Sequence, residues 1–165
     1  MSFRRNMVDY LLSLPEITYI VEDRVSDIFY TFEDVMNSDG NFNKFPAVSV
    51  SQSATTTEHT LGNSPVNLKR EQLQITVYQS LNVQRFRSKQ KSIVCKEEEK
   101  ITKMDRLTDA IETSLNAFTG QVGSFLVRDT RLIDIRDEEF ESEKNRKILA
   151  HQILLDFIIT KTEGA

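Results

Sequence analysis

The stretch REQLQITVYQS, residues 70–80, is the clearest sign of a β-strand in this chain. Its aliphatic residues Leu73, Ile75 and Val77 recur at every second position, with polar residues between them. Successive side chains of a strand point to opposite faces of a sheet, so this spacing puts the three aliphatic residues on one face. We therefore expect a strand with one face against a hydrophobic core.

A second strand is predicted before this one, with a long polar loop between them. Val48 and Val50 alternate with serines after Pro46, and a proline is best tolerated where a strand opens because it lacks a backbone N–H. The segment SQSATTTEHTLGNSP, residues 51–65, then has the composition of a loop. An antiparallel pair is the simplest arrangement of the two strands.

A final pair of strands is predicted to close the chain. In the first strand the alternating residues are Phe125, Val127, Ile133 and Ile135, with an irregularity near residues 129–131. The inward face of the last strand is formed by Leu149, Ile153, Leu155, Phe157 and Ile159. Between the two strands, the segment DEEFESEKNR, residues 137–146, is predicted to be the turn.

Helices are indicated by apolar residues spaced three and four apart. The first stripe consists of Phe3, Met7, Tyr10, Leu11 and Leu14, and a second short helix with Pro15 near its first position follows, its inward residues being Ile17, Ile20 and Val21. The longest stripe consists of Ile101, Met104, Leu107, Ile111, Leu115 and Phe118, with Gly120 placed to cap the helix. The segregation of strands and helices predicts an α+β fold, in which an antiparallel β-sheet is packed on one face by two main α-helices and carries long projecting loops.

The overall composition limits the class of protein. The 165 residues are 39% hydrophobic and 28% charged, which is typical of a globular chain and predicts a single domain over residues 1–165. A net charge of −4 argues against non-specific nucleic-acid binding as the main role. The sequence has no apolar run of membrane-spanning length, and Asp9 interrupts the early apolar run, so neither a membrane span nor a signal peptide is predicted.

The residue types that carry catalysis or bind metals are sparse. His59 lies in the polar loop and His151 lies in the last predicted strand, and neither is expected to be catalytic or to hold a metal. The single cysteine, Cys95, excludes an intramolecular disulfide and is interpreted as a buried or incidental thiol. The acidic runs are interpreted as solvated surface, because paired catalytic carboxylates would stand at a fixed separation in a cleft. We therefore expect no enzymatic activity, no metal and no cofactor.

One basic cluster, RFRSKQK at residues 85–91, stands out against this background. It could contact a nucleic-acid backbone or an acidic protein surface, or it could be a solvated segment whose charge is offset by the glutamates after it. The candidate contacts with a charged partner are Arg85, Arg87, Lys89 and Lys91. The surrounding residues 82–100 could be an inserted loop or the first turns of the long helix.

Three local patterns and their order point to one family. They are VEDRV at residues 21–25, FPAVSVS at residues 45–51, and the closing hairpin around residues 137–147, which leads into ILLDFII at residues 153–159. In this order the chain resembles the tail completion, or tail terminator, family of tailed bacteriophages, which are small head–tail joining proteins. The resemblance spans roughly residues 3–161. The chain departs from the family at residues 82–100, where the family passes quickly from strand to helix, so this segment is interpreted as an insertion.

The resemblance implies a structural role in the virion. Members of the family form a ring, usually of six copies, that caps the head-proximal end of the tail tube, stops its growth and presents a surface to the head connector. The implied partners are further copies of this chain, the tail tube protein and the connector or neck proteins, while DNA passes through the ring without specific binding. The implied location is the neck or tail of a virion assembled in the host cytoplasm.

The predicted loop at residues 51–65 gains a role in such a ring, because loops on a rigid scaffold can carry contacts without disturbing the fold. The candidate contacts with a neighbouring subunit or the tube are Thr55, Thr56, Thr57, Glu58, His59 and Asn63. Two alternatives remain: a neck or head-completion protein of the connector, and a non-viral cytoplasmic module that binds a protein partner through residues 82–100.

Overall fold

The computed structural model describes residues 2–27, 46–59, 67–82, 91–141 and 146–161. The helices in these ranges are α1 (Phe3–Leu12), α2 (Pro15–Val21) and α5 (Lys91–Leu115). The strands are β1 (Val25–Ser26), β2 (Ala47–His59), β3 (Asn67–Asn82), β4 (Gly120–Val122), β5 (Phe125–Glu141) and β6 (Arg146–Lys161).

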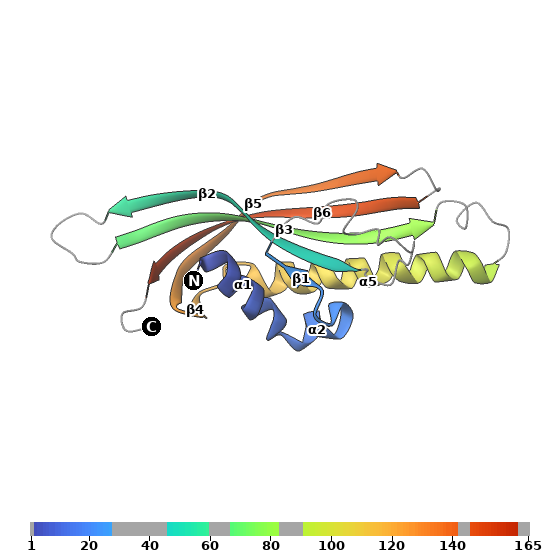
Figure 1. The fold of residues 1–165 in the computed structure, drawn as a ribbon, viewed down its shortest axis with the longest axis horizontal. Coiled ribbons are helices and arrows are strands. Elements are labelled where there is room, and N and C mark those ends of the chain that lie inside the picture. Colours follow the sequence, from blue (N-terminus) through green and yellow to red (C-terminus); the bar gives the residue numbers. More distant parts are fainter. Residues whose placement is uncertain (1, 28–45, 60–66, 83–90, 142–145, 162–165) are drawn as a thin grey trace.

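The strands form one six-stranded sheet in the order β1-β2-β3-β6-β5-β4. All neighbours are antiparallel except β1 and β2, which are parallel. In Figure 1 the helices lie together on one side of the sheet, with α5 running along its length. The α+β class and the mainly antiparallel sheet are therefore confirmed.

The molecule has two distinct ends. Figure 1 shows the β2–β3 hairpin reaching one end, while the β5–β6 hairpin and the start of α5 reach the other. The central strands β3 and β6 pair continuously from Lys69 opposite Ile159 to Asn82 opposite Arg146, so they connect the two ends.

The core lies between the sheet and the helices, as the spacing of apolar residues predicts. Leu73, Ile75 and Val77 of β3 are fully buried. The facing residues of α5 and β6 are also buried, namely Met104, Leu107, Ile111, Leu115, Ile153, Leu155, Phe157 and Ile159. Burying a side chain of this size contributes about 1.5–3 kcal/mol, which offsets part of the conformational entropy lost on folding.

The two N-terminal helices also agree with the prediction. The Ser2 side chain caps α1 by accepting a hydrogen bond from the backbone N–H of Arg5 at 3.3 Å. Phe3 packs edge-to-face on Phe125 and Phe157, with ring centroids 5.6 and 5.2 Å away, so α1 is fixed to the end of the sheet. Pro15 opens α2 in the first turn, where a missing N–H costs nothing.

The predicted loop at residues 51–65 is wrong over most of its length. Strand β2 continues to His59, and Ala54 to His59 pair with β3 from Gln72 to Asn67. A register shift between Gln52 and Ala54 marks a bulge in this hairpin. The physical reason is that a threonine run has high β-propensity, and pairing with β3 satisfies its backbone groups although its side chains are polar. Residues 60–66 lie outside the described residues.

The predicted turn at residues 137–146 is also too long. Strand β5 continues to Glu141 and β6 begins at Arg146. The acidic residues Asp137, Glu138 and Glu139 therefore stand in a strand, opposite residues 151, 150 and 149 of β6. Charged residues are tolerated there because their side chains reach solvent while the backbone pairs.

Helix α5 agrees with one predicted alternative at its start and differs from the prediction at its end. It begins at Lys91. Of the two alternatives for residues 82–100, an inserted loop or the first turns of the long helix, the second is therefore correct from Lys91 on. At the other end the left-handed residue is Ala117, with φ of 53°, and the predicted cap Gly120 instead begins β4. Residues 83–90 lie outside the described residues. None of the described helices combines the length and hydrophobicity needed to cross a membrane.

Candidate functional site

A histidine held by two carboxylates joins helix α5 to the sheet. His151 of β6 lies directly opposite Asp137 of β5, and its Nδ1 is 2.6 Å from Asp137 Oδ1. Its Nε2 is 2.9 Å from Oε1 of Glu112, which projects from α5. The His151 side chain is mostly buried, with 16% of its surface exposed, whereas that of Asp137 is 76% exposed. We call His151, Asp137 and Glu112 the His151 cluster.

The two carboxylates change the titration of the imidazole. Burial alone would lower the pKa of His151, because it disfavours the charged ring. The hydrogen bonds to Glu112 and Asp137, together with the negative charge of both carboxylates, outweigh burial, so the pKa of His151 lies above its ordinary value. The ring is therefore protonated more readily in the folded chain than in the unfolded chain.

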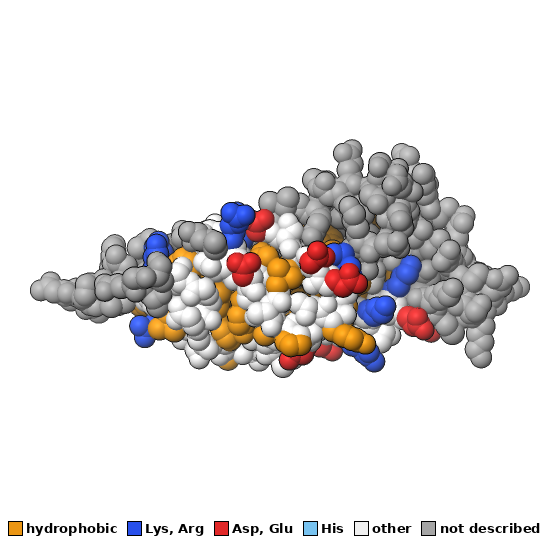
Figure 2. All heavy atoms as spheres, turned by 60° about the horizontal axis from the view of Figure 1, so that its bottom comes forward, with side chains coloured by type: hydrophobic (Ala, Val, Ile, Leu, Met, Phe, Trp, Pro, Cys, Tyr) orange, Lys and Arg blue, Asp and Glu red, His pale blue; other side chains and the backbone are white. Residues whose placement is uncertain are grey.

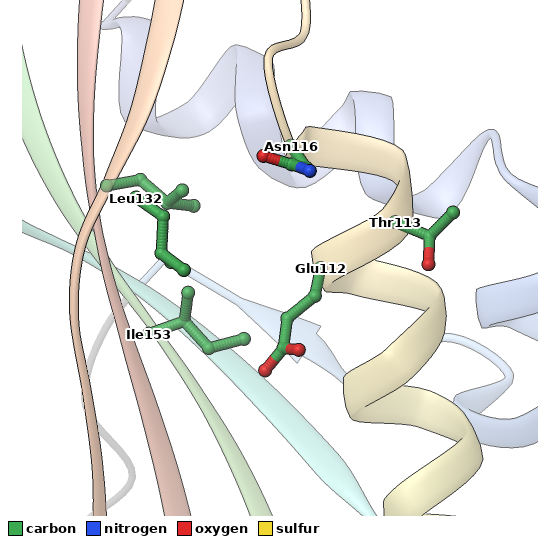
Figure 3. A pocket seen from close by; sticks show the side chains of 6 residues that line it. Glu112, Thr113, Asn116, Leu132 and Ile153 are labelled. Atoms are coloured by element: carbon green, nitrogen blue, oxygen red, sulfur yellow. The ribbon is translucent and has the colours of Figure 1, made fainter.

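Two hollows lie between α5 and the outer strands, one on each side of this cluster. The first, of about 270 Å³, is lined by Glu112, Thr113 and Asn116 of α5 and by Leu132, Ile153 and Leu155 of the strands. Figure 3 shows Leu132 and Ile153 on one wall and Glu112 and Asn116 on the other. The second, of about 370 Å³, is lined by His151 and by the carboxylates Asp105, Asp137, Glu138 and Glu139, with aliphatic residues between them.

The geometry of the His151 cluster fits a structural role better than a catalytic one. A general base needs one ring nitrogen within reach of a substrate proton, but both nitrogens of His151 already contact carboxylates. Among the residues that the structure describes, no group of three histidine, cysteine or acidic side chains is arranged to hold a metal ion. The arrangement fixes α5 against β5 and β6.

The sequence-predicted site residues do not meet in one place within the described ranges. Thr55, Thr56, Thr57, Glu58 and His59 form the outer part of β2. Lys91 is the first residue of α5, and Cys95 lies one turn later. Asn63, Arg85, Arg87 and Lys89 lie outside the described residues, and the contact roles of all these residues remain predictions.

Sequence reasoning missed the partners of His151. Glu112 is 39 residues away in the chain, and Asp137 was assigned to a turn. One signal was present: His151 falls between Leu149 and Ile153 at the inward positions of the last strand. A titratable group in an inward position needs a hydrogen-bond partner, and the acidic run before the strand could supply one.

Exposed apolar side chains gather on one strand. The large hydrophobic residues exposed in the described part of the chain are Tyr19, Leu132, Ile133 and Ile135. Ile133 and Ile135 were expected to alternate like core residues, but they are 47% and 41% exposed. The β5–β6 register shifts between Leu132 and Asp134, and Leu132 faces α5 across the hollow that both line. On the face that Figure 2 shows, apolar side chains lie among acidic and basic ones, so no single sign of charge dominates it.

The fold has a counterpart among solved structures. It is similar to a chain of the structure described as "Virion of native gene transfer agent (GTA) particle", with a TM-score of 0.52. The match covers 93% of this chain and 91% of that chain at 8% sequence identity. At this identity the likeness establishes a shared fold. No family model matches the sequence. The curated proteins contain no match to it either.

Proposed function

We propose that this chain is a structural protein of a phage-like particle, and that it forms the ring which caps the head-proximal end of the tail tube. The observation that carries this proposal is the fold shared with a virion chain over nearly the full length of both. The finer role, capping the tail tube, is suggested by the sequence patterns that resemble the tail terminator family. Further copies of this chain, the tube protein and the head connector are its proposed partners.

The His151 cluster and the two long hairpins suit a protein that joins two partners. The His151 cluster has no ring nitrogen left for a substrate, and it fixes α5 against the strands. The β2–β3 hairpin extends a rigid arm to one end of the molecule, and the β5–β6 hairpin extends a second arm to the other. A subunit between two different partners needs two such ends, one for the tube and one for the neck.

The β2–β3 arm is the proposed contact with the neighbouring subunit or the tube. A closed ring uses a head-to-tail interface, in which one surface of a subunit meets a different surface of the next. The predicted contacts Thr55 to His59 lie in the paired part of this arm, and Asn63 follows it. An arm with a paired backbone can carry contacts at its end with less ordering cost than a loop. The basic residues 85–91 are proposed to contact an acidic surface of the neck.

Electron microscopy of the chain mixed with polymerised tail tube protein tests the function. We expect rings at one end of each tube, and tubes that no longer lengthen when more tube protein is added. Replacing Thr55, Thr56 and Thr57 with glycine should abolish the rings while the core stays folded, and the matched control is Thr102→Gly, on an exposed position of α5. Binding to isolated connectors without any effect on tubes would instead identify a neck protein, and binding to neither would refute a joining role.

Hydrogen exchange gives an independent test of the arm. Residues 51–65 should exchange more slowly in the tube-bound ring than in the free chain, because the ring buries them. Equal exchange in both states would exclude the arm from the assembly contacts.

A further inference from the structure

The outer edge of β5 is open beyond its first residues. Strand β4 pairs only with Phe125 to Val127, and within the described ranges no other strand pairs with this edge of β5. An open edge presents unpaired backbone N–H and C=O groups, to which another strand can pair. The three exposed aliphatic residues Leu132, Ile133 and Ile135 lie in the middle of this open stretch. We call the open stretch from residue 129 to residue 137 the β5 edge.

Four of the charged residues on the β5 edge alternate in sign along the strand. Asp129, Arg131, Asp134 and Arg136 stand opposite β6 positions 158, 156, 154 and 152, which alternate with the buried positions of that strand. All four therefore point away from the helices, and their side chains are 40–73% exposed. Arg131 Nε lies 3.2 Å from Asp129 Oδ2, and Arg136 Nε lies 2.7 Å from Asp134 Oδ2, as expected for neighbours on one face.

The charges of the β5 edge are complementary to those of a second, antiparallel copy of the same strand. In an antiparallel copy aligned with Leu132 opposite Ile133, Arg131 falls opposite Asp134, and Asp129 falls opposite Arg136. Residues directly opposite in an antiparallel pair point to the same face, and all four of these side chains do. Each cation of one copy thus meets an anion of the other, and the twofold axis repeats every contact.

Of the two register shifts in β5, the first lies between Val127 and Asp129, where the β5 edge begins, and the second lies within the edge and does not break this alignment. The register shift between Leu132 and Asp134 lies at the twofold axis itself, so the extra residue Ile133 occurs at the same place in both copies. The exposed aliphatic side chains of the two copies would then meet around the axis. Their contact supplies an apolar centre with charged pairs on both sides, which is the usual anatomy of a protein interface.

We propose that a second copy of this chain pairs antiparallel with the β5 edge, so that two sheets join into one in a twofold dimer. This contact goes beyond the proposed ring. A twofold contact joins identical surfaces, whereas the ring needs two different ones, so the dimer is the form of the free chain. Charged residues and bulges also serve to keep sheet edges apart, and in that case the free chain would be monomeric.

Charge reversal separates these outcomes. Analytical ultracentrifugation of the wild type should show a dimer that dissociates at high salt, because the opposed charges are solvent-exposed. Arg131→Asp places like charges opposite each other at two symmetric positions, so it should raise the dissociation constant at least about tenfold, or about 1.4 kcal/mol. Asp134→Arg should do the same, and the double variant R131D/D134R should restore the dimer by exchanging the partners. Lys103→Glu, on an exposed position of α5, should leave the dimer unchanged.

Hydrogen exchange of the wild type tests the contact without any substitution. Amides of residues 129–137 should become more protected as the concentration rises, while those at the centre of β3 should not change. A monomeric wild type, single reversals that stay dimeric, or protection that does not depend on concentration would overturn the proposal. Ring formation on tubes by R131D is a separate readout, so losing the dimer while keeping the rings would leave the proposed function intact.

Discussion

The His151 cluster predicts a pH-dependent contribution to stability that Glu112→Gln should remove. Glutamine keeps an oxygen that can accept the hydrogen bond from His151 Nε2, now at 2.9 Å, but it removes the negative charge. The variant therefore tests the charge and leaves the geometry in place. We expect the pKa of His151 to fall towards its ordinary value, because one of the two carboxylates that raise it is gone.

The magnitude follows from the exposure of the pair. A hydrogen bond to a charged group contributes about 1.5–3 kcal/mol when buried, and a neutral one about 1 kcal/mol. The His151 and Glu112 side chains are 16% and 32% exposed, so solvent screens part of the difference. The charge should contribute about 1 kcal/mol, which corresponds to a change in Tm of about 2–4 °C for a chain of this size.

The sign of the pH dependence is fixed by the direction of the pKa change. Since the pKa of His151 is raised on folding, its contribution is fully present below the unfolded value of about 6.5 and is lost as pH rises through the folded value. The free energy of unfolding of the wild type should exceed that of E112Q at about pH 6, and the two should converge in alkaline solution.

Urea unfolding across this pH range measures the difference directly, and NMR titration of the imidazole in a His59→Gln background measures the pKa of His151. The matched control is Asp109→Asn, which removes one negative charge from an exposed position of the same helix. A stability difference that stayed the same at every pH would show that Glu112 acts through packing. Asp137→Asn should have a smaller effect on stability than E112Q, because Asp137 is far more exposed and solvent screens its charge. A larger effect of Asp137→Asn would contradict this use of exposure to estimate the magnitude.

Three backbone and core positions give further predictions, each read by urea unfolding. Phe3→Ala should lower the free energy of unfolding by about 3–5 kcal/mol, because it empties the space beside Phe157, and a smaller loss than in Phe3→Leu would contradict the packing. Gly123→Ala should cost more than about 1 kcal/mol, because this residue has φ of 57° and an added Cβ would overlap the Asn6 side chain. Ala117→Gly should stabilise the chain by about 0.5–1 kcal/mol, since φ is 53° there and glycine adopts it without strain, and a loss of stability would contradict that reasoning.

The core could be predicted because its signals are local. Aliphatic residues at every second position predict β3, and the stripe from Met104 to Leu115 predicts the buried face of α5, since each periodicity follows from the geometry of one element. Pro15 likewise marks the start of α2 without reference to the rest of the chain.

The errors came from strands whose side chains are polar. Residues 54–59 and 137–141 are mostly polar and were predicted as a loop and a turn, yet they are strands because partner strands pair with their backbone groups. Amino-acid composition indicates the local preference of a segment for loop or strand. These two segments are strands because their backbones pair with residues far away in the sequence. The length of the two hairpins was therefore not predictable from either segment alone.

The candidate site was hidden for a related reason. Glu112 and Asp137 meet His151 only after α5 has packed on the sheet and β5 has paired with β6. The inward position of His151 could have indicated that a partner exists, but only the register of the sheet identifies it. The dimer contact at the β5 edge could not be predicted from the sequence either. The alternating charges of residues 129–136 suggest a contact only when these residues are known to lie at an open edge of the sheet.

The continuous pairing of β3 with β6 has a mechanical consequence. Fourteen residue pairs, from Lys69 opposite Ile159 to Asn82 opposite Arg146, run the length of the sheet. Their hydrogen bonds are perpendicular to the strands. A pull along the strands from opposite ends would therefore strain the whole ladder at once, whereas a pull across them would open it one rung at a time. The chain should resist tension along its long axis far better than peeling at its edge.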